Sequence, residues 1–197
     1  MRLVRLALDW DASPQEFVEQ WRALYDYGLE DMYADAIGKP QFSGGDVERL
    51  FLWKNSGPLS GKKAKTVRSI TDRIQVVNQL KSSFDMDTFQ EQFDAISAIW
   101  RIFLLHIIVP QAYPIFDQHV YRACHFLETG SIEEIPQSSP SKVRVYFREY
   151  VPFFDALQSG CGASGKQVDE ALWAFGRFLK TASGLLRVAP RCTSVAC

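Results

Sequence analysis

Apolar residues recur every three to four positions along most of the chain, which is the spacing of a helix with one buried face. Helix starts carry capping patterns, such as Ser13 followed three residues later by Glu16. These signals predict helices at about residues 14–27, 30–37, 47–55, 62–80, 88–93, 96–110, 118–127, 141–158 and 165–179. No segment of useful length alternates between apolar and polar residues, so the pattern indicates an all-α fold.

The longest apolar run extends from Ile102 to Val109 and is interrupted by His106. It is far shorter than the roughly 20 residues that span a bilayer, so we expect a buried helix of a soluble protein and no membrane partner. Pro152 should kink or divide the helix predicted over 141–158, because proline lacks the N–H that a helix interior needs.

The chain has 197 residues, of which 47% are hydrophobic and 13% aromatic. That is enough for one well-buried domain or two small lobes sharing a groove, and too little for two independent cores. The four cysteines form no CxxC pair and the last three have no nearby histidine, so no metal site is supported. These cysteines and the absence of a signal-peptide pattern favour a reducing cytoplasm.

Charge is unevenly distributed along the chain. The net charge of −1 argues against a protein whose whole surface binds nucleic acid. Between residues 54 and 81, however, seven basic residues accompany the single acid Asp72. Such a cluster can contact DNA phosphates, or it can be the solvated face of a helix. A second and weaker basic cluster consists of Lys142, Arg144 and Arg148.

Asp117 stands between an apolar stretch and an amphipathic helix. Pro110 and Pro114 predict a short, rigid connection that presents this carboxylate. Aspartate is also a favoured N-cap, because its side chain accepts hydrogen bonds from the free N–H groups at the start of a helix. The position alone therefore allows either a structural cap or a group that does chemistry.

The residues around Asp117 follow the order apolar, Asp, any residue, His, Val, any residue, Arg, as Phe116-Asp117-Gln118-His119-Val120-Tyr121-Arg122. Together with the buried helix and the Pro-containing loop before it, this order resembles the helix-hairpin-helix DNA glycosylase superfamily. The resemblance implies that Asp117 cleaves the bond between base and sugar, supported by His119 and Arg122. It also implies one two-lobed helical domain over residues 1–185, after which we expect a flexible tail at 186–197.

In that superfamily a Leu-Pro-Gly-x-Gly hairpin lies about two dozen residues before the catalytic Asp and binds a DNA phosphate. Here Ala95 and Ser97 stand where the two glycines would be. Members that also cleave the strand place a Lys nucleophile just after the hairpin, and this chain has no Lys between Lys81 and Lys142. The resemblance thus implies a monofunctional enzyme, whose Asp stabilises an oxocarbenium-like sugar and activates water.

The family flips its target nucleotide into a pocket between the two lobes, where aromatic side chains stack on the base. By position, the candidates for this pocket are Trp53, Tyr113, Phe116 and Trp173. Asn55 is the candidate for filling the gap that the flipped base leaves. The candidate DNA contacts are Lys54, Asn55, Lys62, Lys63, Lys65, Arg68 and Ser97.

We therefore expect a monomeric helical protein that binds DNA, with damaged duplex as its substrate, and that hydrolyses an N-glycosidic bond without a metal or cofactor. One alternative is a non-catalytic helical protein that keeps this fold for DNA or protein binding, which the missing hairpin glycines and the nearly neutral charge favour. Another is an unrelated helical bundle in which Asp117 is a cap and nothing more.

Overall fold

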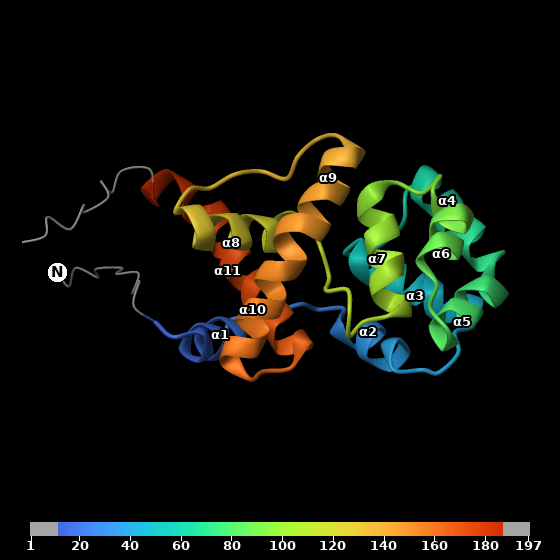
Figure 1. The fold of residues 1–197 in the computed structure, drawn as a ribbon, viewed down its shortest axis with the longest axis horizontal. Coiled ribbons are helices and arrows are strands. Elements are labelled where there is room, and N and C mark those ends of the chain that lie inside the picture. The colour runs from blue at the N-terminus through green and yellow to red at the C-terminus, as the bar shows by residue number, and fades with distance from the viewer. Residues whose placement is uncertain (1–11, 187–197) are drawn as a thin grey trace, which may run out of the picture. The chain divides into compact units, whose positions relative to one another are not determined.

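The computed structural model describes residues 12–186, with side chains described as far as Thr181. Within this part of the chain every regular element is helical and no strand occurs, so the all-α prediction is confirmed (Figure 1). The elements are α1 (Pro14–Arg22), α2 (Glu30–Ile37), α3 (Gly44–Lys54), α4 (Gly61–Thr71), α5 (Ile74–Ser82), α6 (Met86–Phe93), α7 (Ala98–Ile108), α8 (Gln118–Thr129), α9 (Ser139–Val145), the π-helical turn η1 (Tyr146–Tyr150), α10 (Val151–Cys161) and α11 (Gly165–Leu186).

The chain divides into two compact units. Unit 1 contains α1, α8, α11 and α10 apart from its first residue, and unit 2 contains α2 to α7, α9 and η1. The expectation that they are the two lobes of one domain stays a prediction. Because α11 ends at Leu186, the rest of the predicted tail, residues 187–197, lies outside the described residues.

Helix starts agree with the capping patterns in the sequence. At α1 the Ser13 side chain accepts from the Glu16 N–H at 3.3 Å, and the Glu16 carboxylate accepts from the Ser13 N–H at 2.8 Å. Ser164 and Gln167 make the same reciprocal pair at the start of α11. Each pair satisfies N–H groups that have no partner within the helix.

The helix predicted over 62–80 is wrong, because the structure has two helices there, α4 and α5. Several side chains near the break bond to backbone carbonyls of the preceding turn: Ser69 to Thr66, Thr71 to Arg68, and Arg73 to Ser69. Such bonds offer the backbone an alternative to continuous helix, and the N–H of Arg73 turns back to Ile70 at 3.0 Å. The cationic segment is therefore carried on two short helices.

Pro152 neither ends nor divides the helical run, which is continuous from Ser139 to Cys161. Instead the π-helical turn η1 lies directly before it, and the N–H of Val151 bonds to Tyr146 five residues back. A π turn accommodates one extra residue. The helical run therefore continues past Pro152 although the proline has a bulky ring and no N–H to donate.

Unit 2 is built around α7, whose residues from Ile102 to Ile108 are all buried. His106 lies among them with both ring nitrogens engaged: Nε2 is 2.8 Å from the Tyr33 hydroxyl, and Nδ1 is 2.7 Å from the backbone oxygen of Tyr113. No helix in the described part of the chain has the length and apolar character that crossing a membrane requires.

Before α7, the residues 94–97 connect it to α6, and the N–H of Ile96 turns back to the Phe93 oxygen at 3.1 Å. Asp85 caps α6 by accepting from the Thr88 N–H at 2.8 Å. Arg101, on the first turns of α7, holds this turn by donating to the carboxylate and, at 3.2 Å, to the backbone oxygen of Asp94. That these two helices act as the hairpin of the glycosylase motif stays a prediction.

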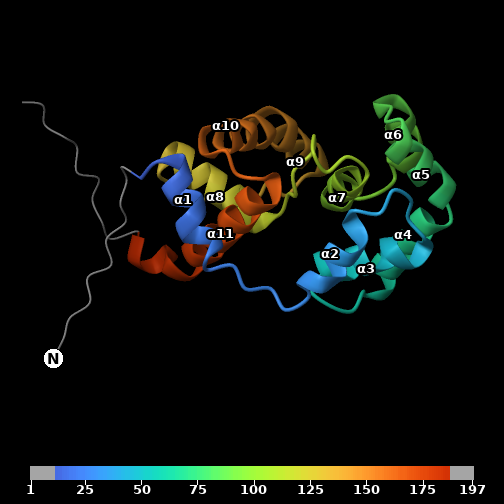
Figure 2. The same ribbon diagram turned by 90° about the horizontal axis from the view of Figure 1, so that it is seen from below.

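Unit 1 is built on the close approach of α8 and α11, which lie side by side in Figures 1 and 2. Phe175 of α11 packs against Phe126 of α8 at 5.7 Å and against Trp21 of α1 at 4.7 Å, both between ring centroids. The predicted α1 extended to residue 27, but it ends at Arg22, because the N–H groups of Leu24 and Tyr25 form tighter turns to carbonyls three residues back.

The start of α3 gives a pH-dependent contribution to stability. A hydrogen bond from Lys39 and further bonds from Ser43 lower the pKa of Asp46 from 3.8 to about 2. A carboxyl whose folded pKa lies below its unfolded value stabilises above the unfolded pKa and loses that contribution as pH falls through the folded one. We expect the free energy of unfolding to fall by about 1–2 kcal/mol between roughly pH 4 and pH 2. The loss is modest because Lys39 is partly exposed and water screens its charge.

Urea unfolding followed by circular dichroism between pH 2 and pH 6 measures this loss, with Asp46→Asn as the matched variant. The Asn variant should be less stable at pH 6 and show a flatter dependence below pH 4. Equal slopes for the two proteins would show that Asp46 has an ordinary pKa in the folded state.

Candidate site around Asp117

Asp117 precedes the first residue of α8 and belongs to unit 2. Its side chain is 24% exposed, and its Oδ2 atom is 3.1 Å from the Nζ atom of Lys54. Lys54 is the last residue of α3, so this ion pair joins two positions 63 residues apart. The predicted catalytic carboxylate is therefore held by a cation that the sequence analysis had assigned to DNA binding.

Lys54 is itself almost fully covered, with 6% of its side chain exposed. Its Nζ atom also lies 5.6 Å from the centre of the Phe103 ring on α7, within the range of a cation–π contact. A covered ammonium is costly unless a charge or ring compensates it. Lys54 is thus part of the Asp117 site, and it is not among the exposed cations that a DNA backbone can reach.

Tyr27 lies close to the same pair, although the sequence analysis did not single it out. Its hydroxyl donates to the backbone oxygen of Trp53 and lies 2.9 Å from the Ser56 hydroxyl. Burial raises the pKa of Tyr27, and the negative charge of Asp117 adds to that increase. The Tyr27 hydroxyl therefore stays protonated at neutral pH, and the negative charge of Asp117 favours that protonated form.

Two of the four aromatic candidates for a base pocket are enclosed in the core. Trp53 is 6% exposed and packs on Tyr33 at 4.6 Å between ring centroids. Phe116 has no exposed surface and packs on Tyr146 and Tyr150 at 5.2 and 5.1 Å. Stacking on a base would first require these side chains to be uncovered, because their neighbours already cover the rings.

The other two aromatic candidates keep accessible surface. Tyr113 of unit 2 is partly exposed and lies 5.7 Å from Phe84 between ring centroids, and burial raises its pKa. Trp173 of unit 1 is also partly exposed, between Tyr25 at 5.3 Å and His119 at 5.4 Å. Both rings can offer a surface to a ligand within their own units.

His119 and Arg122, predicted to support Asp117, lie in unit 1 and make structural contacts there. Arg122 is 1% exposed, and its Nη1 atom donates to the backbone oxygen of Gly176 at 3.0 Å. Its Nη2 atom is 2.7 and 3.0 Å from the two carboxylate oxygens of Glu134. Arg122 therefore ties α8 to α11 and to the segment after α8.

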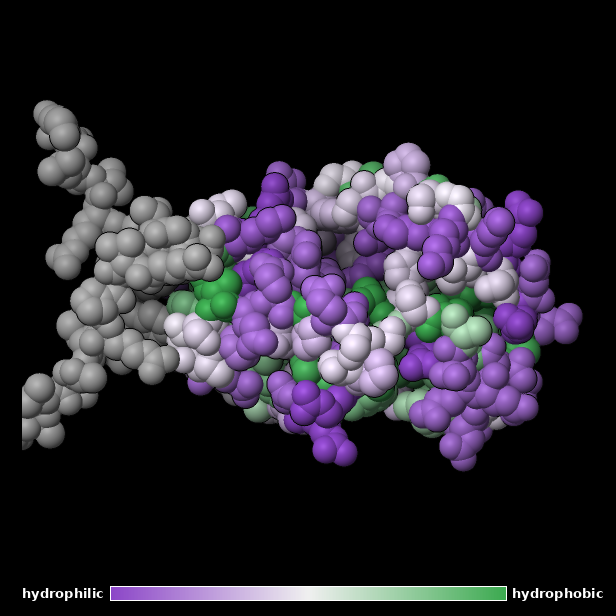
Figure 3. Space-filling model, turned by 90° about the horizontal axis from the view of Figure 1, so that it is seen from above, coloured by the Kyte–Doolittle hydropathy of each residue, from purple (hydrophilic) through white to green (hydrophobic). Residues whose placement is uncertain are grey.

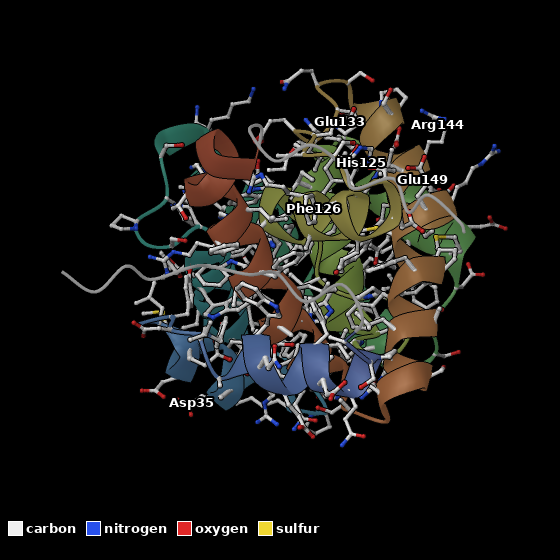
Figure 4. All side chains as sticks on the ribbon, turned by 90° about the vertical axis from the view of Figure 1, so that its left-hand side faces the viewer. Asp35, His125, Phe126, Glu133, Arg144 and Glu149 are labelled. Carbon is white, nitrogen blue, oxygen red and sulfur yellow. The ribbon has the colours of Figure 1, made fainter. Side chains whose placement is uncertain are left out.

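A second side-chain contact anchors the same segment. His125 on α8 and Glu133 approach each other in Figure 4, with 3.1 Å between His125 Nε2 and Glu133 Oε2. Together with Arg122, this contact fixes the chain where it leaves unit 1.

Arg122→Lys is expected to destabilise the protein by about 2–4 kcal/mol. A single ammonium cannot bond both to Gly176 and to the Glu134 carboxylate as the planar guanidinium does, and a buried charge would lose part of its compensation. Urea unfolding measures the loss. Arg22→Lys at the exposed end of α1 is the matched control and should cost little; equal losses for both variants would contradict the buried role of Arg122.

The cations that remain accessible from the predicted DNA-binding cluster lie on α4. Their side chains are exposed, and they comprise Lys62, Lys63, Lys65 and Arg68. Lys63 also bonds to the Asn55 side-chain oxygen at 2.5 Å and lies 5.8 Å from the centre of the Trp100 ring. This helix face can contact phosphates from within unit 2.

Asn55, the candidate for filling a gap in DNA, uses its side chain in its own loop. Its Nδ2 atom donates to the backbone oxygens of Gly57 at 3.1 Å and Pro58 at 2.8 Å. Ser56 in the same loop has a positive φ of 59°, a conformation that these bonds stabilise. The amide would have to give up these bonds before it could insert into DNA.

Ser97 occupies the N-cap position of α7 and is exposed, with no side-chain bond to the helix start. Ala95 beside it is exposed as well, so the turn between α6 and α7 presents small residues to solvent. Among the described residues no group of three or more His, Cys, Asp or Glu side chains is placed to hold a metal ion.

The structure thus brings Asp117, Lys54, Tyr27 and Trp53 together in unit 2, while His119, Arg122 and Trp173 belong to unit 1. Sequence reasoning missed Tyr27 and the pairing of Lys54, because neither has a local signal. Comparison with family models, with curated proteins and with solved structures finds no match for this chain.

Proposed function

We propose that this protein binds DNA and hydrolyses the bond between a base and its sugar, with Asp117 as the catalytic carboxylate. The observation that carries the proposal is the position of Asp117, directly before α8. Its side chain is 24% exposed, and its Oδ2 atom is held 3.1 Å from the buried Nζ atom of Lys54. The resemblance of residues 116–122 to the helix-hairpin-helix glycosylases supports the same role.

When the base departs, positive charge develops on the C1′ atom and ring oxygen of the sugar. A carboxylate that is already oriented stabilises this charge without reorganising at the moment of reaction. Lys54 supplies that orientation through its bond to Oδ2, and Asp117 can also orient or deprotonate the attacking water. Asp117 is thus the group that acts on the substrate, and Lys54 positions it.

The exposed cations of α4 supply the DNA contacts in this proposal. Lys62, Lys65 and Arg68 project from one short helix of unit 2 and can neutralise phosphates of a duplex. Each neutralised phosphate releases condensed cations, so binding should weaken steeply as salt rises.

A second candidate function is DNA binding without catalysis. The enclosed rings of Trp53 and Phe116 favour it, since no stacking surface is open at these two positions. The Lys54 ion pair would then be a structural link within unit 2, between the end of α3 and the loop that ends at Asp117.

The experiment that separates the two candidates is base release from duplexes carrying alkylated, deaminated or oxidised bases, with enzyme in excess. Abasic sites formed over time are counted after strand cleavage by mild alkali. The proposal predicts release from at least one duplex by the parent and by Asp87→Asn, an exposed acid of unit 2, and its loss in Asp117→Asn. Release that Asp117→Asn retains would contradict the proposed mechanism, and no release from any duplex would favour the non-catalytic candidate.

A further inference from the structure

A groove of about 790 Å³ lies within unit 2, away from the residues that hold Asp117. One side is formed by residues 94–98, which connect α6 to the start of α7, together with Arg101. The other side is formed by α9 and η1, which contribute Arg144, Phe147 and Arg148. Two of the three residues in the second basic cluster, Arg144 and Arg148, therefore border this groove.

The charge of the groove is positive. Arg101, Arg144 and Arg148 line it together with a single acid, Asp94, which already pairs with Arg101. Asp94 is 83% exposed and the Arg101 side chain 20% exposed, and their ion pair leaves Arg101 already compensated. Arg144 and Arg148 are exposed, and Figure 4 shows Arg144 on the helical run, with Glu149 further along it. Two more guanidinium groups thus remain for an anion.

Phe147, which lies between Arg144 and Arg148 in the sequence, adds an aromatic surface to the groove. It is 38% exposed, and its ring is held edge-on by Tyr146 at 5.0 Å and Tyr113 at 6.2 Å between centroids. The face of the molecule in Figure 3 is largely hydrophilic, with hydrophobic residues exposed in smaller patches. A phenyl ring fixed by its neighbours and open to a charged groove can stack on a flat ligand.

The groove shares Asp94, Arg101, Val143 and Phe147 with a mainly apolar pocket of about 170 Å³. Phe89, Ile102 and Leu105 are among the residues that line this pocket. The arginines, the Phe147 ring and the apolar pocket together fit a ligand that has a flat, weakly polar ring with negative charges on either side of it. Acidic or phosphoserine side chains match the charges but offer no ring to Phe147, and a phosphotyrosine carries its phosphate on one side of the ring only.

We propose that this groove binds an unpaired nucleotide of a DNA strand, with its base stacked on Phe147 and the flanking phosphates bound by Arg144 and Arg148. One guanidinium group can donate two parallel N–H bonds to two oxygens of a phosphate. An aromatic ring can stack on any of the four bases. The base must be unpaired, because in a duplex both of its faces are covered by neighbouring bases. This site does not depend on Asp117, so it stands or falls separately from the proposed catalysis.

The test is binding of a fluorescein-labelled ten-nucleotide oligothymidylate to the full chain, followed by anisotropy at several salt concentrations. Phe147→Leu keeps an apolar side chain without a stacking ring and should weaken binding by about 5- to 150-fold. Phe147→Trp should retain the affinity. Arg144→Gln with Arg148→Gln should weaken binding by about 10-fold or more and reduce the salt slope by about 1.4.

Lys62→Gln with Lys65→Gln removes the same charge from the exposed face of α4 and serves as the matched control. It should lower oligothymidylate affinity less than the arginine pair does. Circular dichroism confirms that each variant is folded.

Oligothymidylate affinity that Phe147→Leu and the arginine pair leave unchanged would overturn the proposal. So would a phosphopeptide of equal charge that binds as tightly as oligothymidylate and loses affinity only with the arginines, since that outcome identifies a peptide site. Asp117→Asn should bind oligothymidylate like the parent, so loss of base release and loss of this binding are separate results.

Discussion

Gly176→Ala is expected to prevent stable folding of unit 1. A Cβ atom at this position would lie 1.9 Å from the backbone oxygen and 2.6 Å from the carbonyl carbon of His119, distances that real Cβ atoms do not show. Because the obstacle is the backbone of α8, no side chain can rotate away. We expect a loss of at least about 4 kcal/mol, a large share of the roughly 5–15 kcal/mol that stabilise a typical domain.

The loss has a second cause in the same place. Relieving the clash pushes α8 away from α11, which also stretches the 3.0 Å bond from Arg122 to the Gly176 oxygen. Urea unfolding followed by tryptophan fluorescence measures the effect. Gly165→Ala, at the start of the same helix, is the control, because a Cβ there meets only side-chain atoms at 3.7 Å or more. Equal stability of the two variants would contradict the close approach of α8 and α11.

Asp117→Asn is expected to reduce base release by about 10²- to 10⁴-fold, the range for removing a charged group that stabilises a transition state or acts as general base. The amide keeps the shape of the side chain but carries no charge. Single-turnover rates at saturating enzyme measure the chemical step without a contribution from binding. Duplex affinity should stay within a few-fold of the parent, because the cations of α4 are unchanged.

The same substitution should also cost stability, which must be separated from the effect on rate. Lys54 would lose its carboxylate while 6% exposed, and we expect about 1–2 kcal/mol, since Asp117 itself is 24% exposed. Adding Lys54→Met removes the uncompensated charge and should recover part of the stability without restoring base release. Recovery of both in the double variant would show that Asp117→Asn had acted through folding.

Local signals in the sequence predict much of this fold. The bounds of α2 agree with the prediction, and the capping pairs at Ser13 and Ser164 form as expected, because a helix start depends on contacts three residues apart. Prediction failed where local effects compete. Side-chain bonds near Thr71 interrupt a helix whose apolar spacing is continuous, and the π turn before Pro152 absorbs a residue that usually breaks helices.

The candidate site is less predictable. The placement of Asp117 at the start of α8 follows from the prolines before it, whereas its partner Lys54 comes from a helix 63 residues earlier and needed the fold to be found. Aromatic residues at helical spacing look alike whether they face a core or a pocket. Trp53 and Phe116 are covered, while Trp173 keeps exposed surface, and no local pattern separates them.

The central claim is that the charge of Asp117 faces a sugar that becomes positive during the reaction. A duplex carrying a pyrrolidine in place of one deoxyribose presents a cation at that position, and a tetrahydrofuran duplex is its neutral counterpart. A group that stabilises the transition state should favour the cationic analogue. Competition binding of both duplexes to the parent and to Asp117→Asn therefore measures the claim directly.

The parent should bind the pyrrolidine duplex about 10- to 100-fold more tightly than Asp117→Asn does. This ratio corresponds to the free energy of one hydrogen bond between charged groups. The two proteins should bind the tetrahydrofuran duplex alike and more tightly than undamaged DNA. Equal binding of the cationic duplex by both proteins, or no preference for either analogue over undamaged DNA, would contradict the account.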